Sequence, residues 1–197
     1  MFDLQAQCTF EVLSDNQLIT GFNCGDEELN YFFNFEALHF KHQLLAQTCF
    51  FRHNESGEVV CAFSISPNAL KTTDLPGSRR KKVREYIPRE KSLQSYPAFL
   101  VGRLGVAFEY NGKGIGTQLI GFIKAYCYEN FPDFCRFLLI DAYNDNSILN
   151  FYQKNNFSFV FSTEEQERIA YRIDTTKPLE TRYLFYDMIH WKNESAL

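Results

Sequence analysis

The sequence lacks any apolar run long enough to cross a membrane. None of its 197 residues belongs to a stretch of the roughly 18 consecutive apolar residues that a membrane-spanning helix needs. The first segment, MFDLQAQCTFEVL, also lacks the basic region followed by an apolar region that marks a secretory signal peptide. We therefore expect a cytoplasmic protein.

Paired cysteine motifs are missing as well. The sequence has six cysteines without Cys-x-x-Cys spacing, and most of them lie in apolar runs: Cys8, Cys24, Cys49, Cys61, Cys127 and Cys135. This distribution is typical of reduced core thiols rather than of disulfides or a metal centre. His39 and His42 lie three residues apart in a predicted helix but have no third ligand, so we expect no metal site.

No strong excess of one charge is present. The net charge is -4 and the isoelectric point about 5.6, which argues against a dedicated nucleic-acid binder but allows a local basic patch. One such patch lies in a polar insertion at about 67–96: Arg79, Arg80, Lys81, Lys82 and Arg84. Two interpretations stay open, a solvated surface segment and a contact with tRNA phosphates.

With 45% apolar and 17% aromatic residues, the chain can fill the core of one domain spanning 1–197. Hydrophobic periodicity predicts alternating strands and helices. We expect strands at 10–15, 48–53, 58–66, 98–108, 136–143, 157–162 and 181–191. We expect helices at 24–46, as one helix or two short ones, at 115–130 and at 147–155, the last capped by Asp145 or Asn146. These elements indicate an α+β or α/β sandwich.

Three glycines stand between the apolar strand 98–108 and the helix after it, in EYNGKGIGTQLI. The first N–H groups of a helix have no backbone partner, and the helix dipole favours negative charge there, so glycines at this place let a phosphate approach. A Walker loop would need Gly at Ala107 and Ser or Thr at Gly114, and a dinucleotide fingerprint would need Gly or Ala at Thr117. Neither motif fits.

The segment NGKGIG resembles the Q/R-x-x-G-x-G/A loop of the GNAT acetyltransferases, VGRLGV resembles their central strand, and NFYQKNNFSF resembles their closing motif. The resemblance implies a GNAT-like sandwich with a mixed, mostly antiparallel sheet of about six to seven strands, flanked by about four helices. It also implies acetyl-CoA as co-substrate, with its pyrophosphate on the loop and its pantetheine arm along the strand. The implied contact residues are Asn111, Gly112, Lys113, Gly114, Ile115 and Gly116 in the loop, and Leu104, Gly105 and Val106 in the strand.

By the same resemblance Tyr152 is the general acid that protonates the leaving thiolate. A phenol with a pKa near 10 is a suitable donor to a thiolate whose conjugate acid lies near 8.5. Without the resemblance, Tyr152 would be interpreted as a helix residue packing beside Phe151.

The chain departs from the family pattern twice: Asn111 replaces Gln or Arg, and Asn156 replaces the Gly before Phe157. Because Asn tolerates the left-handed conformation, we expect the second turn to survive.

The acceptor is predicted to be a primary amine. The strand 98–108 carries no carboxylate, and Glu109 comes only after it, so no strong general base is visible. This favours an α-amine, which is partly neutral at pH 7, over a lysine side chain. Arg103, the one charge in the strand, either pairs with an acid or faces the substrate groove.

The segments GFNCGDEELNYFF and VGRLGV resemble more narrowly the GNAT toxins of bacterial toxin–antitoxin pairs. That resemblance implies the alternative function of acetylating the α-amine of aminoacyl-tRNA. A homodimer is also compatible with the sequence. An alternative from another class is a non-catalytic acyl-CoA-binding sensor or interaction module.

Overall fold

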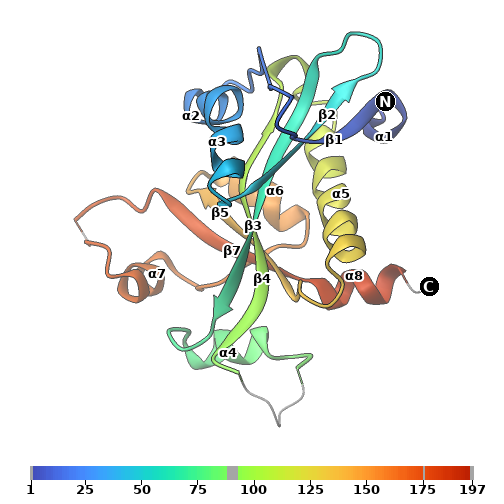
Figure 1. Ribbon diagram of the computed structural model, residues 1–197. Helices are drawn as coiled ribbons and strands as arrows, with labels where there is room; N and C mark the ends of the chain where they lie inside the picture. The colour runs from blue at the N-terminus through green and yellow to red at the C-terminus, as the bar shows by residue number, and fades with distance from the viewer. Residues whose placement is uncertain (1, 88–92, 175, 196–197) are drawn as a thin grey trace. The chain divides into compact units, whose positions relative to one another are not determined.

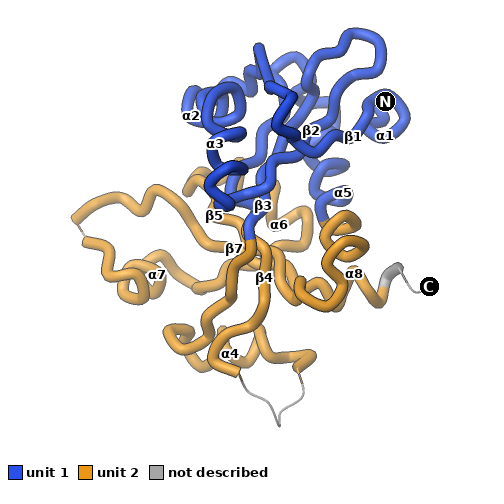
Figure 2. Tube along the Cα trace, viewed as in Figure 1, with its two compact units in different colours: residues 1–66, 101–123 blue, residues 67–100, 124–197 orange. Residues whose placement is uncertain are grey.

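The computed structural model describes residues 2–87, 93–174 and 176–195. The chain divides into two compact units (Figure 2): residues 1–66 with 101–123, and residues 67–100 with 124–197. We call them unit 1 and unit 2 and describe each by itself. Two long strands and one long helix contribute residues to both units. The expectation of a single acetyltransferase domain over 1–197 stays a prediction.

The strands form one seven-stranded sheet with the order β1-β2-β3-β4-β5-β7-β6 (Figure 1). Their bounds are β1 Cys8–Val12, β2 Gln47–His53, β3 Val59–Lys71, β4 Ser95–Val106, β5 Phe137–Tyr143, β6 Ser158–Phe159 and β7 Thr181–Asp187. The α-helices are α1 Leu4–Gln7, α2 Glu27–Tyr31, α3 Ala37–His42, α4 Gly77–Val83, α5 Ile115–Asn130, α6 Asn146–Lys154, α7 Glu164–Tyr171 and α8 Met188–Ser195. The predicted mixed sheet of six to seven strands is confirmed, with more short helices around it than expected.

Unit 1 is built on an antiparallel hairpin with a helical segment packed beside it. β1 pairs with β2 and β2 with β3, both antiparallel. The predicted helix at 24–46 is one continuous helical segment from α2 to α3, with a π-helical turn at Phe32–Glu36. Asp26 caps its start by accepting a hydrogen bond from the backbone N–H of Leu29 at 2.9 Å. The π-helical turn places Phe32 and Phe33, each 1% exposed, in the core of the unit.

Unit 2 is built on β5 and β7, which pair antiparallel along their whole length, from Phe137 opposite Asp187 to Tyr143 opposite Thr181. Successive side chains of a strand point to opposite faces. Phe137, Leu139 and Phe185 therefore share one face, and they form a buried cluster with Tyr96 and further apolar residues of the unit.

Four strand predictions are wrong in extent. β1 ends at Val12 rather than at residue 15, and β3 continues to Lys71, into the insertion predicted at 67–96. The segment 157–162 forms only the short β6, because the chain leaves the sheet to bury Phe161 and then starts α7. Thr163 caps α7 with its hydroxyl, which accepts a hydrogen bond from the Gln166 N–H. The predicted strand 181–191 ends at Asp187, and α8 follows it. Helix α7 was not predicted, although its acidic first turn is a helix-start signal.

A buried ion pair ties α7 to the sheet in unit 2. Arg182 Nε donates to Glu167 Oε2 at 2.6 Å, and the other carboxylate oxygen of Glu167 accepts from the backbone N–H of Tyr183 at 2.7 Å. The two side chains are 8% and 3% exposed. Burial raises the pKa of Glu167, while the bonds to Arg182 and Tyr183 oppose the shift. Both carboxylate oxygens are thus satisfied, as a buried charge requires.

Replacing Glu167 should therefore be costly. We expect Glu167→Ala to lower the free energy of unfolding by about 3–5 kcal/mol, because it leaves the Arg182 charge buried without its partner. Glu165→Ala is the matched control on the exposed side of the same helix and should change stability by less than about 0.5 kcal/mol. Urea unfolding followed by circular dichroism measures both. A loss below about 1 kcal/mol in Glu167→Ala would contradict the structural role of the pair.

Candidate functional site

The glycine loop in unit 1 has the backbone that the sequence predicts. After a short 3-10 turn, Phe108–Tyr110, Gly112 and Gly114 take φ angles of 73° and 78°. These left-handed angles strain other residues but not glycine. No atom lies within 4 Å of the place where a Cβ would stand at either position. The glycines are therefore required for their backbone angles and leave the loop surface open.

Helix α5 starts directly after this loop and is anchored by Ile115, which is 1% exposed. Its first backbone hydrogen bond runs from the Gln118 N–H to the Gly114 carbonyl at 3.3 Å. The first turn contains no acidic residue, and Asn111, Gly112, Lys113 and Gly114 are exposed. A sixteen-residue helix thus presents unpaired N–H groups beside an open loop, an arrangement that suits a phosphate ligand.

The strand before the loop is covered on one side in unit 1. A Cβ added to Gly105 would stand 3.2 Å from the Cys24 sulfur and 3.2 Å from the Phe22 ring, so only glycine fits without a shift. Leu104 and Val106, the flanking residues predicted to pair with a pantetheine arm, are half-buried. At the end of the strand, the Phe108 N–H donates to the Asn23 carbonyl at 2.8 Å.

Arg103 lies against aromatic rings and, among the described residues, does not form the ion pair that was one of its two expected environments. Its guanidinium carbon lies 4.6 Å from the centre of the Phe32 ring and 5.7 Å from that of Phe40. Within the part of the chain that the structure describes, no carboxylate pairs with it. The half-buried charge is thus stabilised by two aromatic faces. Its assignment to the substrate side stays a prediction.

Tyr152 lies in α6 of unit 2, where the predicted cap is confirmed. Asp145 Oδ1 accepts hydrogen bonds from the N–H groups of Ser147 at 2.8 Å and Ile148 at 3.2 Å. Tyr152 is 8% exposed, and its ring packs edge-on against Phe157 with the centroids 5.8 Å apart. Burial raises the pKa of Tyr152 to about 12. The phenol therefore keeps its proton throughout the physiological pH range.

The turn after α6 forms as expected, although Asn156 stands where the family pattern has Gly. Asn156 has a left-handed φ of 67°, and the Phe157 N–H closes the turn on the Tyr152 carbonyl at 3.0 Å. The buried Lys124 fixes this turn from α5: its Nζ donates to the Asn155 carbonyl at 2.8 Å and lies 3.7 Å from the centre of the Tyr186 ring. Tyr152 thus sits on a helix whose two ends are both held.

Most of the basic run lies in α4 of unit 2, and four of its five cations donate hydrogen bonds to other groups of the unit. Arg79 donates to the Val160 carbonyl at 3.1 Å, Arg80 to the Thr72 carbonyl at 3.0 Å, Lys82 to the Ser158 hydroxyl at 3.1 Å and Arg84 to the Leu93 carbonyl at 2.9 Å. Partial burial lowers the pKa of Arg79. Among the described residues, none of the five cations forms an ion pair with a carboxylate. Their charge is therefore not neutralised locally.

The remaining chemistry-bearing groups form no further centre among the described residues. All six cysteines are free thiols, and five of them are buried. No group of three potential metal ligands occurs in residues 2–87, 93–174 and 176–195. Over the same ranges, no helix is long and apolar enough to cross a membrane.

The predicted residues thus divide between the two units. The strand Leu104–Val106 and the loop 111–116 belong to unit 1, while Tyr152 and the basic run belong to unit 2. Sequence reasoning missed Asp141, Glu167, Tyr171 and Tyr183, which line a cavity of unit 2. A signal existed for Asp141, since it interrupts the apolar strand FLLIDAY.

Comparisons with known proteins bear on the fold. No protein-family model and no curated protein matches the chain. Solved structures do match. A complex of AtaT with acetyl-methionyl-tRNAfMet has a TM-score of 0.73 at 17% identity, covering 95% of this chain and 99% of that one. A Tyr-to-Phe mutant of KacT has a TM-score of 0.73 at 18% identity, with the same coverage. A Tyr-to-Phe mutant of the toxin AtaT, bound to acetyl-CoA and the C-terminus of the antitoxin AtaR, has a TM-score of 0.69 at 15% identity, covering 97% and 99%.

These likenesses span nearly the whole chain and confirm the predicted GNAT-like α/β fold. At such low sequence identities they establish the fold and not the activity.

The burial of Tyr152 predicts how stability changes at high pH. Up to about pH 10 the phenol is protonated in both folded and unfolded chains. Between about pH 10 and 12 the unfolded chain loses this proton while the folded chain keeps it, so the free energy of unfolding falls. Over the full interval the loss attributable to Tyr152 is about 3 kcal/mol.

Urea unfolding at about pH 9, 10 and 11 tests this. Tyr152→Phe should show a shallower decline than the wild type, whereas Tyr31→Phe, which changes a tyrosine that is 58% exposed, should decline like the wild type. Equal declines for the wild type and Tyr152→Phe would show that the hydroxyl is not shielded from water.

Proposed function

We propose that this chain is an acetyl-CoA-dependent N-acetyltransferase whose acceptor is the α-amine of an aminoacyl-tRNA. The observation that carries the proposal is the likeness to AtaT complexed with acetyl-methionyl-tRNAfMet, which extends over 95% of this chain. The open glycine loop before α5 and the buried Tyr152 supply, in this chain, the two features that the chemistry needs. This function is the alternative from the sequence, and the likeness favours it over an unspecified primary amine.

The residues of unit 1 fit acetyl-CoA. The N–H groups of Gly112, Gly114 and Gly116 and the start of α5 would hold the pyrophosphate, because the loop is exposed, free of side-chain obstruction and without acidic residues. Lys113 lies with its Nζ 4.8 Å from the centre of the Tyr110 ring and adds positive charge beside the loop. Asn111 contributes no charge there, in contrast to an Arg. The bound coenzyme supplies an acetyl group activated as a thioester.

Tyr152 is the proposed proton donor. As the amine attacks the thioester carbon and the carbon–sulfur bond breaks, its hydroxyl donates toward the sulfur that leaves. With its pKa near 12 and a thiol pKa of about 8.5, complete transfer is uphill by about 3–4 pKa units. Tyr152 therefore acts first as a hydrogen-bond donor to the developing negative charge. An α-amine, partly neutral near pH 7, needs little help from a base.

The proposed macromolecular partners follow from the same likenesses. The five cations of α4 and its C-terminal end lack carboxylate partners among the described residues and offer a positive surface to tRNA phosphates. Four of them also donate hydrogen bonds to other groups of unit 2, so Lys81 is the member whose side chain makes no hydrogen bond within the described residues.

A small antitoxin protein is the proposed regulatory partner, as AtaT is bound to the C-terminus of AtaR.

The loop proposal is tested by paired glycine substitutions. Gly114→Ala forces an alanine into a left-handed backbone at roughly 1–2 kcal/mol and should weaken acetyl-CoA binding about tenfold in calorimetry. Gly121→Ala, inside α5 where no atom lies within 4 Å of the added methyl group, is the control and should bind acetyl-CoA like the wild type. Undiminished binding by Gly114→Ala would remove the loop from the coenzyme site.

The catalytic proposal is tested with radiolabelled acetyl-CoA and a mixture of charged tRNAs. The wild type should acetylate aminoacyl-tRNA, and Tyr152→Phe should lower the rate by about 10²-fold or more while acetyl-CoA affinity changes less than about twofold. Tyr31→Phe should retain the wild-type rate. Peptidyl-tRNA hydrolase should release the acetylated amino acid.

Two results would count against this proposal. Transfer to free amines without transfer to charged tRNA would support the broader N-acetyltransferase prediction instead. An unchanged rate in Tyr152→Phe would return Tyr152 to a packing role.

A further inference from the structure

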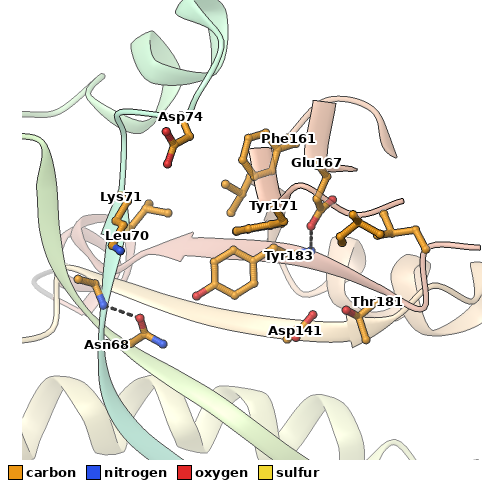
Figure 3. Close-up of a pocket in the computed structure, with 14 residues that line it drawn as sticks. Asn68, Leu70, Lys71, Asp74, Asp141, Phe161, Glu167, Tyr171, Thr181 and Tyr183 are labelled. Carbon is orange, nitrogen blue, oxygen red and sulfur yellow. Dashed lines mark hydrogen bonds between the residues drawn. The ribbon is translucent and has the colours of Figure 1, made fainter. Parts of the chain in front are cut away.

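Unit 2 contains a cavity of about 450 Å³ that the proposed reaction does not use (Figure 3). Its walls come from the end of β3, from β5 and β7, and from α7 with the chain after it. The volume lies within the range of roughly 300–1,000 Å³ that is typical of small-molecule sites. The cavity is therefore large enough to hold a compact organic ligand.

The cavity and Tyr152 lie on opposite faces of the β5–β7 pair. Asp141 stands opposite Tyr183 in the register, and both side chains line the cavity. Tyr186, three residues further along β7, points to the other face. There it packs against Phe157, the neighbour of Tyr152, with the ring centroids 5.7 Å apart. The contacts that hold Tyr152 are thus separate from the walls of the cavity.

The interior of the cavity is apolar and aromatic. Leu70, Val160 and Phe161 are almost fully buried and line it. The rings of Tyr171 and Tyr183 meet at nearly a right angle, 87°, with their centroids 6.3 Å apart. Figure 3 shows Tyr183 between Leu70 and Thr181, with Tyr171 beside it. A ligand would therefore contact two aromatic rings over an apolar floor.

Three of the four charged residues that line the cavity are acidic: Asp74, Asp141 and Glu167. Glu167 is neutralised by Arg182, but Asp74 and Asp141 form no ion pair among the described residues, and Lys71 is the one lysine in the lining. Burial raises the pKa of Tyr183 to about 12, and Asp141 adds to the shift. Burial likewise raises the pKa of Tyr171, with contributions from Glu167, Asp141 and Asp74. The negative charges of these carboxylates therefore act on the two tyrosines that line the cavity.

We propose that this cavity binds an organic cation that carries a primary ammonium group at one or both ends of an apolar stem. Asp74 and Asp141, which are exposed at the cavity, attract positive charge, and the faces of the two tyrosine rings attract it as well. The stem covers the apolar floor. An anion of the same size would meet two carboxylates against one lysine. The proposal does not depend on the acetyltransferase function, since it concerns binding in the absence of coenzyme.

Calorimetry on the full chain without acetyl-CoA tests the cavity, with 1,5-diaminopentane as the probe and 1,5-pentanediol as its neutral match. We expect saturable binding of the diamine and at least tenfold weaker binding of the diol. Asp141→Asn and, on a separate segment, Asp74→Asn should each weaken diamine binding at least fivefold. Glu165→Gln, an exposed carboxylate of α7 outside the cavity lining, should leave it unchanged.

Adding acetyl-CoA then shows whether the bound diamine is a substrate or an effector. Binding without acetylation is expected for a cavity on the face opposite Tyr152 and would identify the ligand as an effector. Acetylation that is lost together with binding in both Asn variants would instead identify the bound diamine as an acceptor substrate; both outcomes support the cation site. The proposal is overturned if the diamine does not bind at millimolar concentration, if the diol binds equally well, or if both Asn variants, checked for wild-type thermal unfolding, bind like the wild type.

Discussion

The proposed coenzyme site depends on the left-handed backbone at Gly112 and Gly114. These two residues turn the chain from β4 into α5 so that the helix starts with open N–H groups rather than with a side chain across them. The buried Ile115 then holds the first turn of α5 in the core of unit 1. In the proposed site the backbone N–H groups and Lys113 would stabilise a negatively charged ligand without the usual Gln or Arg at Asn111.

Tyr152 is subject to the opposite constraint. The proton-donor role proposed for it requires a fixed position, which α6, the turn at Asn156 and the buried Lys124 provide. The same burial raises its pKa and makes it a weaker acid than a free phenol. Such a group stabilises developing negative charge through a hydrogen bond more readily than it surrenders its proton. Positioning is thus obtained at the expense of acidity.

Most of the fold was predictable because the decisive patterns are local. The apolar strand before the glycine loop, the periodic helix after it and the Asp145 cap all have short-range physical causes, and the structure has each of them. The segments 157–162 and 181–191 near the C-terminus were predicted less well. Apolar residues at 157–162 and 181–191 suit a strand or a buried turn equally, and only their packing shows that Phe161 leaves the sheet and that α8 begins at Met188.

The sequence by itself determined the α/β fold class and the glycine loop, because glycine angles, caps and hydrophobic periods act over a few residues, whereas Tyr152 became a candidate acid only through the family resemblance. Only the tertiary structure decided how the charges are used. Arg103 stacks on Phe32, Arg79 bonds to the Val160 carbonyl and Lys82 bonds to the Ser158 hydroxyl, because partners distant in sequence come within reach. The cavity beside Asp141 likewise exists only once α7, β5, β7 and the end of β3 are brought together, and no local pattern encodes that meeting.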